Sequence, residues 1–330
     1  MTFKVAVVGG GSWGTTVAHL VSHNTETKIW CRDAEVARSI TRKHRNTKYL
    51  GRHRLHPDLE ASNDLEEVVS HAQVILMAIP SQSYREVFRE LIGFAKPEIP
   101  IISLAKGLEQ QSQLTMTQLM EDESPGRLTG VLTGPNLAAE VLSGYATASV
   151  VAMQNQSMQF EIAKIFSTDT FRVYTSRDVI GCELGGAFKN VLALAVGMTT
   201  GLGTGDNTRA AVVTRGLAEL ARLGSAMGGL PETFSGLAGL GDLVATCFSP
   251  QSRNRYVGEQ LGKGRDIQEV LSEMSNVAEG VVTAPVVSDL AKEHGVETPI
   301  SDQVAAVVRG VTTPADAYDV LLLREQGSEH

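Results

Sequence analysis

The sequence has few cysteines, no apolar run long enough to span a bilayer and no excess of positive charge. Its three cysteines, Cys31, Cys182 and Cys247, are an odd number, lie far apart and form no C-x-x-C pair, which argues against a disulfide framework. The apolar stretch over residues 191–205 is uncharged, but it is rich in glycine and threonine and too short for a transmembrane helix. The first residues lack the basic head and apolar core of a signal peptide. We therefore expect a cytoplasmic protein without membrane insertion.

The balance of charge excludes another group of partners. The chain has 29 basic and 37 acidic residues, a net charge of -8, and a broadly acidic surface binds neither nucleic acid nor anionic membranes. A phosphorylated ligand would therefore need cations gathered at one site. The basic residues are densest between 38 and 54, which we interpret as a solvated helix face and loop, with attraction of anionic ligands as the alternative. His53 and His56 we assign to a solvated loop, and we expect no metal site.

The first half of the chain alternates short apolar runs with amphipathic stretches. Several of the apolar runs do not alternate with polar residues, which is typical of a parallel sheet covered on both faces. A helix is predicted near Asn63, with Glu66 in capping-box spacing, and another over residues 83–95. This alternation predicts a Rossmann-like, doubly wound α/β domain. The expected strands are residues 4–8, 28–31, 74–79, 99–104, 130–132, 148–153 and 171–174.

The pattern changes after Asp178. Strand-like runs nearly vanish, and long stretches with helical spacing follow, broken by glycine-rich turns. A length of 330 residues suits two domains. We therefore expect a dinucleotide-binding Rossmann domain over residues 1–180 and a mostly α-helical substrate-binding and catalytic domain over residues 181–330, with the boundary at the start of a long helix.

Residues 9–14 form a G-x-G-x-x-G motif directly after the first expected strand and before a helical run. Gly9 would permit the tight turn, Gly11 would let the backbone approach a pyrophosphate, and Gly14 would let the helix pack closely on the strand. The N-terminus of the helix would then offer free N–H groups and a positive dipole to the phosphates. The motif predicts a bound dinucleotide.

The second strand is followed by Arg32 and Asp33. An acidic residue about 20 positions after the glycines binds the ribose hydroxyls of NAD, whereas an arginine accommodates the additional phosphate of NADP. Because the two residues are adjacent, a shift of one position decides which of them faces the ribose. The cofactor is therefore expected to be NAD or NADP.

Ligands of open α/β sheets lie at the carboxyl ends of the strands. Lys106 and Gly134 each follow a predicted strand, so they are expected at this edge. A lysine in a loop is most often simply solvated. At the end of a strand and followed by Gly107, however, Lys106 is better explained as a ligand-binding cation.

A second group of candidate residues lies in the C-terminal half. Lys189 follows a Gly185–Gly186 pair on one helix face, and an internal pair of glycines costs about 2 kcal/mol relative to alanine. Either a flat ring lies against that face or another helix packs closely on it. Farther on, Asp242 is either a helix cap or a partner of a reacting group. Arg253, flanked by Ser252 and Asn254, is either a surface charge or a phosphate clamp.

Taken together, these segments resemble the bacterial NAD(P)-dependent glycerol-3-phosphate dehydrogenase family, and the resemblance extends from end to end. Asn136, Leu137 and the missing proline in the loop over residues 48–55 depart from the family pattern without touching these segments. The matching segments are Gly9-x-Gly11-Ser12-Trp13-Gly14, Ala105-Lys106-Gly107, Gly134-Pro135, Ala187-x-Lys189-Asn190, Gly239-Leu240-Gly241-Asp242-Leu243, Ser252-Arg253-Asn254-Arg255 and Val277-Ala278-Glu279-Gly280.

The resemblance implies an oxidoreductase that interconverts dihydroxyacetone phosphate and sn-glycerol 3-phosphate. It implies that Lys189 is the acid/base, that Asp242 acts beside it, and that Lys106 and Gly134 adjoin the substrate. The substrate phosphate would lie at Ser252, Arg253 and Asn254. Members of the family are typically cytoplasmic homodimers that supply phospholipid synthesis. The residues implied to contact the dinucleotide are Gly9, Gly11, Ser12, Trp13, Gly14, Arg32, Lys106, Ala138, Arg253, Val277 and Glu279.

Two other functions share part of this pattern. Ketopantoate and β-hydroxyacid dehydrogenases share the glycine loop and a helical domain with a catalytic lysine, but not the segments around Asp242 and Arg253. A non-catalytic redox sensor would need the glycine loop and would have no use for Lys189, Asp242 and Arg253 together.

Overall fold

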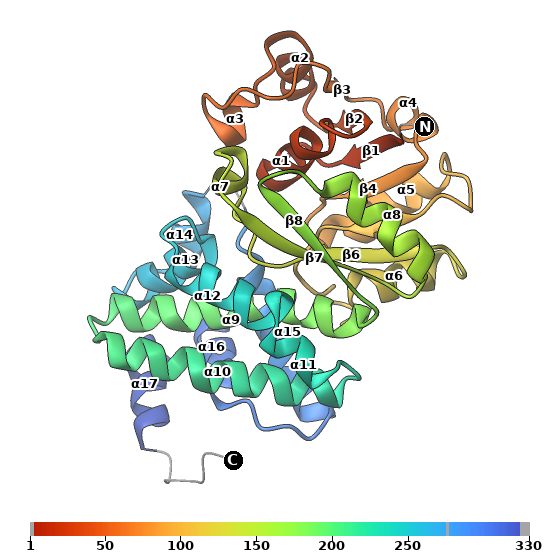
Figure 1. Cartoon of the computed structure of the whole chain (residues 1–330). Helices are drawn as coiled ribbons and strands as arrows, with labels where there is room; N and C mark the ends of the chain where they lie inside the picture. Colours follow the sequence, from red (N-terminus) through yellow and green to blue (C-terminus); the bar gives the residue numbers. More distant parts are fainter. Residues whose placement is uncertain (1–2, 275–276, 324–330) are drawn as a thin grey trace. The chain divides into compact units, whose positions relative to one another are not determined.

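The computed structural model describes residues 3–274 and 277–323. The chain divides into two compact units, residues 1–183 and 184–330, and passes from one to the other within helix α9 (Val179–Gly201). A long helix does start at the change of pattern, as the sequence indicated. Each unit has its own set of elements (Figure 1).

The first unit is built on an eight-stranded sheet in the order β3-β2-β1-β4-β5-β6-β7-β8 (Figure 1). Neighbouring strands are parallel, except that β6 and β7 are antiparallel. The chain order reverses between β1 and β4, which is the point where open α/β sheets bind ligands. The strands are β1 (Lys4–Val8), β2 (Glu26–Trp30), β3 (Glu60–Ser62), β4 (Val74–Met77), β5 (Ile101–Ser103), β6 (Thr129–Thr133), β7 (Thr147–Met153) and β8 (Phe171–Ser176).

Side chains of β1 show why the first unit folds as a three-layer sandwich. Val5 and Val7 belong to one buried cluster and Ala6 and Val8 to another, because successive side chains of a strand point to opposite faces. Helices α1, α2 and α8 pack on the first cluster, and α4, α5 and α6 on the second. The Rossmann-like α/β fold is confirmed. The helical elements are α1 (Ser12–Val21), α2 (Ala34–Lys43), α3 (Thr47–Leu50), α4 (Leu65–Ser70), η1 (Ser81–Ser83), α5 (Tyr84–Ile92), α6 (Met116–Glu123), α7 (Ala138–Leu142) and α8 (Gln156–Phe166).

Two sequence expectations need correction. The sheet contains β3, which was not predicted because this edge strand is only three residues long and has no apolar run. Helix α4 is capped by Asp64 and not by Asn63: the Asp64 carboxylate accepts from the N–H of Glu67. Asn and Asp are equally good caps, so their adjacency left the first helical residue uncertain by one.

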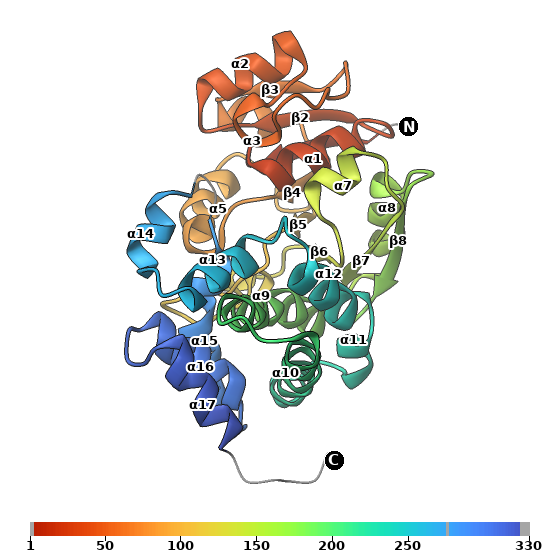
Figure 2. The ribbon, with the colours of Figure 1, turned by 90° about the vertical axis from the view of Figure 1, so that its left-hand side faces the viewer.

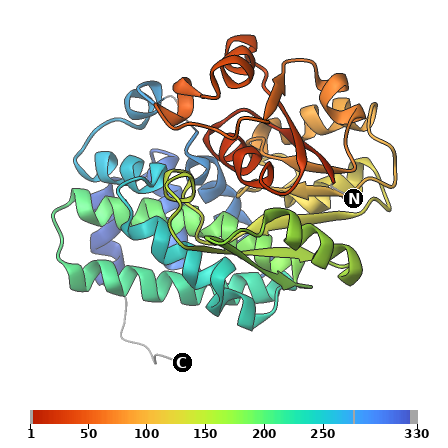
Figure 3. The ribbon, with the colours of Figure 1, turned by 45° about the horizontal axis from the view of Figure 1, so that its top comes forward.

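The second unit is helical, and its described residues contain no strand. Helix α9 is long and apolar enough to cross a membrane, but 89% of its apolar window is buried inside the protein, as expected for a core helix. Helix α10 runs beside it (Figures 1 and 3), and Gly216 of α10 packs on Leu192 of α9. The helical elements after α9 are α10 (Asp206–Ala226), α11 (Pro231–Ser235), η2 (Leu237–Gly241), α12 (Asp242–Phe248), α13 (Arg253–Gly262), α14 (Ile267–Ser272), α15 (Glu279–Glu293), α16 (Pro299–Val308) and α17 (Pro314–Leu322).

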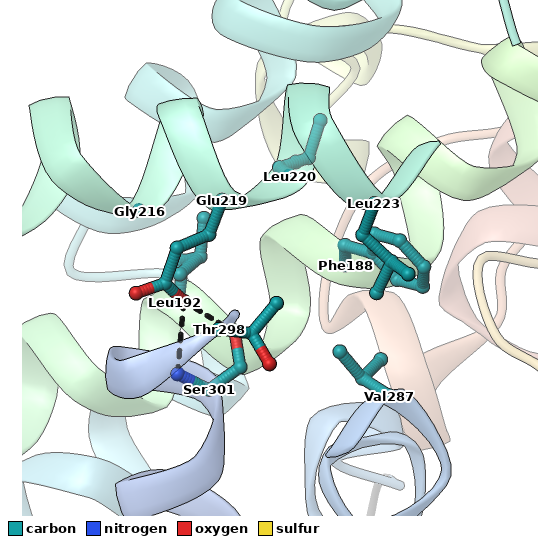
Figure 4. A pocket seen from close by; sticks show the side chains of 9 residues that line it. All are labelled: Phe188, Leu192, Gly216, Glu219, Leu220, Leu223, Val287, Thr298 and Ser301. Carbon is teal, nitrogen blue, oxygen red and sulfur yellow. Dashed lines mark hydrogen bonds between the residues drawn. The ribbon is translucent and has the colours of Figure 1, made fainter. Parts of the chain in front are cut away.

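A buried glutamate side chain joins α10 to α16, which itself lies beside α15 and α17 (Figure 2). Glu219 is 2% exposed and accepts hydrogen bonds from the backbone N–H groups of Ile300 and Ser301, at 2.7 and 3.1 Å. Figure 4 shows the contact between Glu219 and Ser301. The Ser301 hydroxyl also donates to it at 3.0 Å. Glu219 therefore caps α16 from a different helix, a role that sequence spacing does not show.

Candidate active site

The glycine loop between β1 and α1 has the geometry that its sequence predicts. Gly9 has a φ of +124°, and a Cβ on it would overlap the carbonyl oxygen of Ala78. A Cβ on Gly14 would overlap the carbonyl oxygen of Gly9. The turn and packing roles expected of Gly9 and Gly14 are therefore confirmed. Because Ala78 follows β4, the loop lies at the point where the strand order reverses.

Gly11 differs from its neighbours, because a Cβ on it would have no atom within 4 Å. It is the N-cap of α1, so the backbone N–H groups of the first turn begin here. Open space in front of a helix N-terminus is what a pyrophosphate needs, both for its bulk and for its charge. Ser12 and Trp13 are the first two residues of α1, and the buried indole N–H of Trp13 has no partner among the described residues. The loop therefore fits a dinucleotide.

The side chains of Arg32 and Asp33 lie in different surroundings. The Asp33 carboxylate caps α2 by accepting from the N–H of Glu35 at 2.9 Å, and it accepts from Lys48 Nζ at 2.8 Å. The bond to Lys48 is the main cause that lowers the pKa of Asp33. The Arg32 side chain is exposed. The carboxylate of Asp33 is thus engaged by its own helix and by a lysine from the next segment.

Lys106 lies in the loop after β5 and is not a solvated lysine. Its ammonium donates to the carbonyl oxygen of Gly134 at 2.8 Å and to Asn136 Oδ1 at 2.7 Å. Asn136 is buried and in turn donates to the Ser149 hydroxyl at 3.3 Å. Lys106 and Gly134 are therefore brought together at the carboxyl edge of β5 and β6, and Ala138 begins α7 shortly after them. In the sequence Asn136 stands out only as a departure from the family pattern, and its bond to Lys106 could not be predicted.

The second unit brings Lys189 and Asp242 together. Lys189 is 6% exposed and Asp242 is 2% exposed, and Lys189 Nζ lies 3.0 Å from Asp242 Oδ1. The ammonium also donates to the Thr246 hydroxyl at 2.6 Å, and that hydroxyl lies 3.2 Å from the same carboxylate oxygen. Sequence reasoning missed Thr246, although its spacing of four from Asp242 places both on one face of α12.

The local structure assigns roles to Asp242 and to Gly185. Asp242 is not the cap of α12, because Gly241 occupies that position and the Asp242 carboxylate faces Lys189. Gly185 is needed for close packing, since a Cβ on it would lie 2.6 Å from the carbonyl oxygen of Ala238 in η2. Segment η2 is a π-helix, an irregularity that occurs often at functional sites.

The Ser252–Asn254 triplet begins α13. Ser252 is the N-cap and accepts from the N–H of Arg255 at 3.2 Å, while the Arg253 side chain is exposed. Asn254 is buried: it donates to Asn190 Oδ1 at 2.9 Å and accepts from the N–H of Gly280 at 2.9 Å. A cation at the start of a helix, where the backbone N–H groups point outward, is a suitable arrangement for an anion.

Val277 and Glu279 flank the start of α15. Val277 is 49% exposed, and Glu279 is the first residue of the helix after the Ala278 N-cap. The Glu279 carboxylate lies near enough to act on the charge of Arg253. The hydrogen bond between Asn254 and Gly280 keeps the starts of α13 and α15 together. Arg253 and Glu279 are therefore brought together, as residues of one site would be.

The two halves of the chain match two family models. The N-terminal domain of NAD-dependent glycerol-3-phosphate dehydrogenase matches residues 4–159, and its C-terminal domain matches residues 178–319. The chain is 52% identical over 329 residues to glycerol-3-phosphate dehydrogenase [NAD(P)+] 2 of Sphingopyxis alaskensis, covering 100% of this chain and 99% of that protein. It is 48% identical over 327 residues to glycerol-3-phosphate dehydrogenase [NAD(P)+] of Mycobacterium avium, covering 99% of this chain and 96% of that protein.

A solved structure agrees with these relatives. The crystal structure of glycerol-3-phosphate dehydrogenase from Coxiella burnetii superposes with a TM-score of 0.93 at 35% identity, over 98% of this chain and 99% of that one. Matches of this extent cover both units and each of the segments described above. The chain belongs to the NAD-dependent glycerol-3-phosphate dehydrogenase family.

Proposed function

We propose that this chain catalyses reversible hydride transfer between NAD(P)H and dihydroxyacetone phosphate, giving sn-glycerol 3-phosphate. The observation that carries the proposal is the buried ammonium of Lys189, which Asp242 and Thr246 hold from one side. A lysine ammonium has three N–H donors, and the described residues supply partners for two of them. The third is available to an oxygen of the substrate.

The bound nicotinamide would supply the hydride that adds to the ketone carbon. Negative charge then grows on the ketone oxygen, and Lys189 would donate a proton to it. An ammonium group already carries the proton that the reduction consumes, so we infer that reduction is the favoured direction at neutral pH. Asp242 and Thr246 would act by fixing the position of the ammonium, because two bonded donors leave little rotational freedom.

We assign the substrate phosphate to Ser252, Arg253 and Asn254 at the start of α13, because an arginine beside helix N–H groups suits a doubly charged anion. Lys106 and Gly134, which bond each other, are also assigned to the substrate. Dinucleotide binding is assigned to residues 1–180, and substrate binding and catalysis to residues 181–330. The proposed dinucleotide contacts are Gly9, Gly11, Ser12, Trp13, Gly14, Arg32, Lys106, Ala138, Arg253, Val277 and Glu279.

The biological setting follows from the proposed activity. Glycerol 3-phosphate is the backbone of phospholipids, so we propose a cytoplasmic enzyme that supplies phospholipid synthesis. We also propose a homodimer, without membrane insertion or bound metal. Sedimentation analysis of the purified chain would test the dimer, and a monomer at assay concentrations would contradict it.

The experiment that tests the proposed function follows nicotinamide absorbance with dihydroxyacetone phosphate and with ketopantoate, using NADH and NADPH in turn. Oxidation of either cofactor with dihydroxyacetone phosphate alone is the expected result. Turnover with ketopantoate instead would assign the chain a different substrate. Tight cofactor binding without turnover of either ketone would indicate a sensor.

A further inference from the structure

Asn46 makes contacts that the sequence and the proposed mechanism do not use. It lies between α2 and α3 and is 1% exposed. Its side-chain Nδ2 donates to the carbonyl oxygen of Gly10 at 2.9 Å and to the Thr15 hydroxyl at 2.8 Å. That hydroxyl lies 3.3 Å from the same carbonyl oxygen. A residue 36 positions away in sequence therefore holds the middle of the glycine loop.

Local secondary structure does not explain this placement. Asn46 is the N-cap of α3, a position where asparagine usually bonds the N–H groups of its own helix, but here its side chain makes no capping bond. Its Oδ1 is buried and has no partner among the described residues. A buried amide oxygen without a partner reduces stability. The two donors of the side chain are therefore directed to the Gly10 carbonyl in the glycine loop and to the Thr15 hydroxyl in α1.

The contact with Gly10 fixes the orientation of a particular peptide group. A trans peptide is planar, so its C=O and N–H point in opposite directions. Holding the Gly10 carbonyl toward Asn46 directs the N–H of Gly11 away from Asn46. A Cβ on Gly10 would lie 2.5 Å from Cys31 Sγ, so the backbone there also packs closely against the residue that follows β2. The Gly10–Gly11 peptide is therefore bonded by Asn46 and closely packed at Gly10.

The same segment contacts the loop at a second point. The Ser12 hydroxyl donates to the carbonyl oxygen of Tyr49 in α3 at 3.3 Å. Residues 46–49 therefore bond the glycine loop both before and after Gly11, whose own surroundings are open. We propose that Asn46 is a positioning residue of the dinucleotide site, which turns the Gly11 N–H toward the pyrophosphate. This inference rests on the proposed dinucleotide binding.

The test is Asn46→Ala in the full chain, with Kd measured by titration of NADH, NADPH and ADP-ribose. Losing an aligned donor to a pyrophosphate should raise all three Kd values about ten- to hundredfold. ADP-ribose contains the pyrophosphate without the nicotinamide, so an equal loss there places the defect at the phosphates. The KM for dihydroxyacetone phosphate and kcat at saturating cofactor should change less than about twofold, because the acid and phosphate groups are untouched.

Asn24→Ala is the matched control. Asn24 Nδ2 also holds backbone carbonyl oxygens of the first unit, those of Lys164, Ile165 and Ser167 at 3.4, 3.1 and 2.8 Å, but it lies beyond the opposite end of α1. This variant should lose thermal stability and keep the three Kd values. An equal rise of Kd in both variants would show that any loosening of the unit weakens binding, and would overturn the positioning role.

The outcomes separate this inference from the proposed function. If the wild-type chain binds no dinucleotide, the proposed function fails and Asn46 loses its role with it. If the wild type binds and Asn46→Ala binds equally well, only the positioning role is overturned. Should Asn46→Ala not fold, a crystal structure of the wild type with a dinucleotide decides: a Gly11 N–H turned away from the pyrophosphate contradicts the inference.

Discussion

The ammonium of Lys189 lies 3.0 Å from Asp242 Oδ1, and the hydroxyl of Thr246 bonds both groups. Helix α9 supplies the cation, and one face of α12 supplies both partners. Because Lys189 and Asp242 are almost fully buried, removing either partner would leave an uncompensated charge. Each of the three side chains therefore depends on the other two, and together they fix the direction of the remaining N–H of Lys189.

The first prediction concerns the acid itself. Lys189→Met keeps the unbranched side chain up to the ε position and removes the proton donor, so kcat should fall about 10²–10⁴-fold. The Kd for NADH should stay close to that of the wild type, since the glycine loop is unchanged. Steady-state kinetics and a cofactor titration measure the two quantities. A variant with unchanged kcat would remove Lys189 from the chemistry.

The second prediction separates position from charge at Thr246. Thr246→Val has the same shape but cannot accept from Lys189 or donate to Asp242, so kcat should fall about tenfold with little change in KM. Thr246→Ser keeps the hydroxyl and should recover most of the activity. If the valine and serine variants are equally active, the hydroxyl does not position the ammonium.

The third prediction concerns Arg253 and the substrate phosphate. Arg253→Ala should raise the KM for dihydroxyacetone phosphate roughly ten- to hundredfold, because a charge-assisted hydrogen bond is lost. Arg255→Ala is the control: that side chain belongs to the same helix but bonds the Ser249 carbonyl oxygen and Glu259. An equal rise of KM in both variants would argue for a general effect of charge and against a phosphate clamp.

The sequence predicted the elements that hydrophobic patterning determines. Seven strands, the glycine loop and the long helix at the boundary all follow from local composition and spacing. Strand β3 could not be predicted in this way, because a polar edge strand of three residues has no hydrophobic pattern. The cap of α4 was misplaced by one residue, because Asn63 and Asp64 compete and only the backbone decides between them.

The site was predicted in part for a similar reason. The residue types of Lys106, Lys189 and Asp242 indicated catalytic or binding roles. Lys189 and Asp242, however, are 53 positions apart in sequence, and only the packing of their two helices pairs them. The roles of Thr246 and Asn46 were invisible in the sequence, since a threonine in a helix and an asparagine at a cap are ordinary occurrences. Their partners are set by tertiary contacts alone.

The fourth prediction uses the open space at Gly11. Gly11→Ala should fold normally, because its φ is -72° and no atom lies within 4 Å of the added methyl group. The methyl would instead occupy the space assigned to the pyrophosphate, so the Kd for NADH should rise at least about tenfold. Gly14→Ala is the contrasting variant and should lose stability, since its Cβ overlaps the Gly9 carbonyl oxygen. Unchanged NADH binding by folded Gly11→Ala would place the dinucleotide elsewhere.

The fifth prediction concerns stability and its dependence on pH. Burial is the main cause that raises the pKa of Glu219, although hydrogen bonds from Ile300 and Ser301 oppose the shift. Above the pKa of an unfolded glutamate, about 4.3, the unfolded chain has lost this proton while the folded protein still holds it. The folded state then binds more protons, so the contribution of Glu219 to the free energy of unfolding decreases as pH rises through that window.

Glu219→Gln removes this titration while keeping the shape of the side chain. The difference in unfolding free energy between wild type and variant should therefore be largest near pH 4 and shrink as the pH is raised through the folded-state pKa. Urea unfolding at a series of pH values measures it. Glu232→Gln, at an exposed position of α11, is the control for the loss of one glutamate at a site outside this contact. If the difference between wild type and Glu219→Gln does not vary with pH, Glu219 holds no proton in the folded state, and the carboxylate caps α16 in its ionised form throughout.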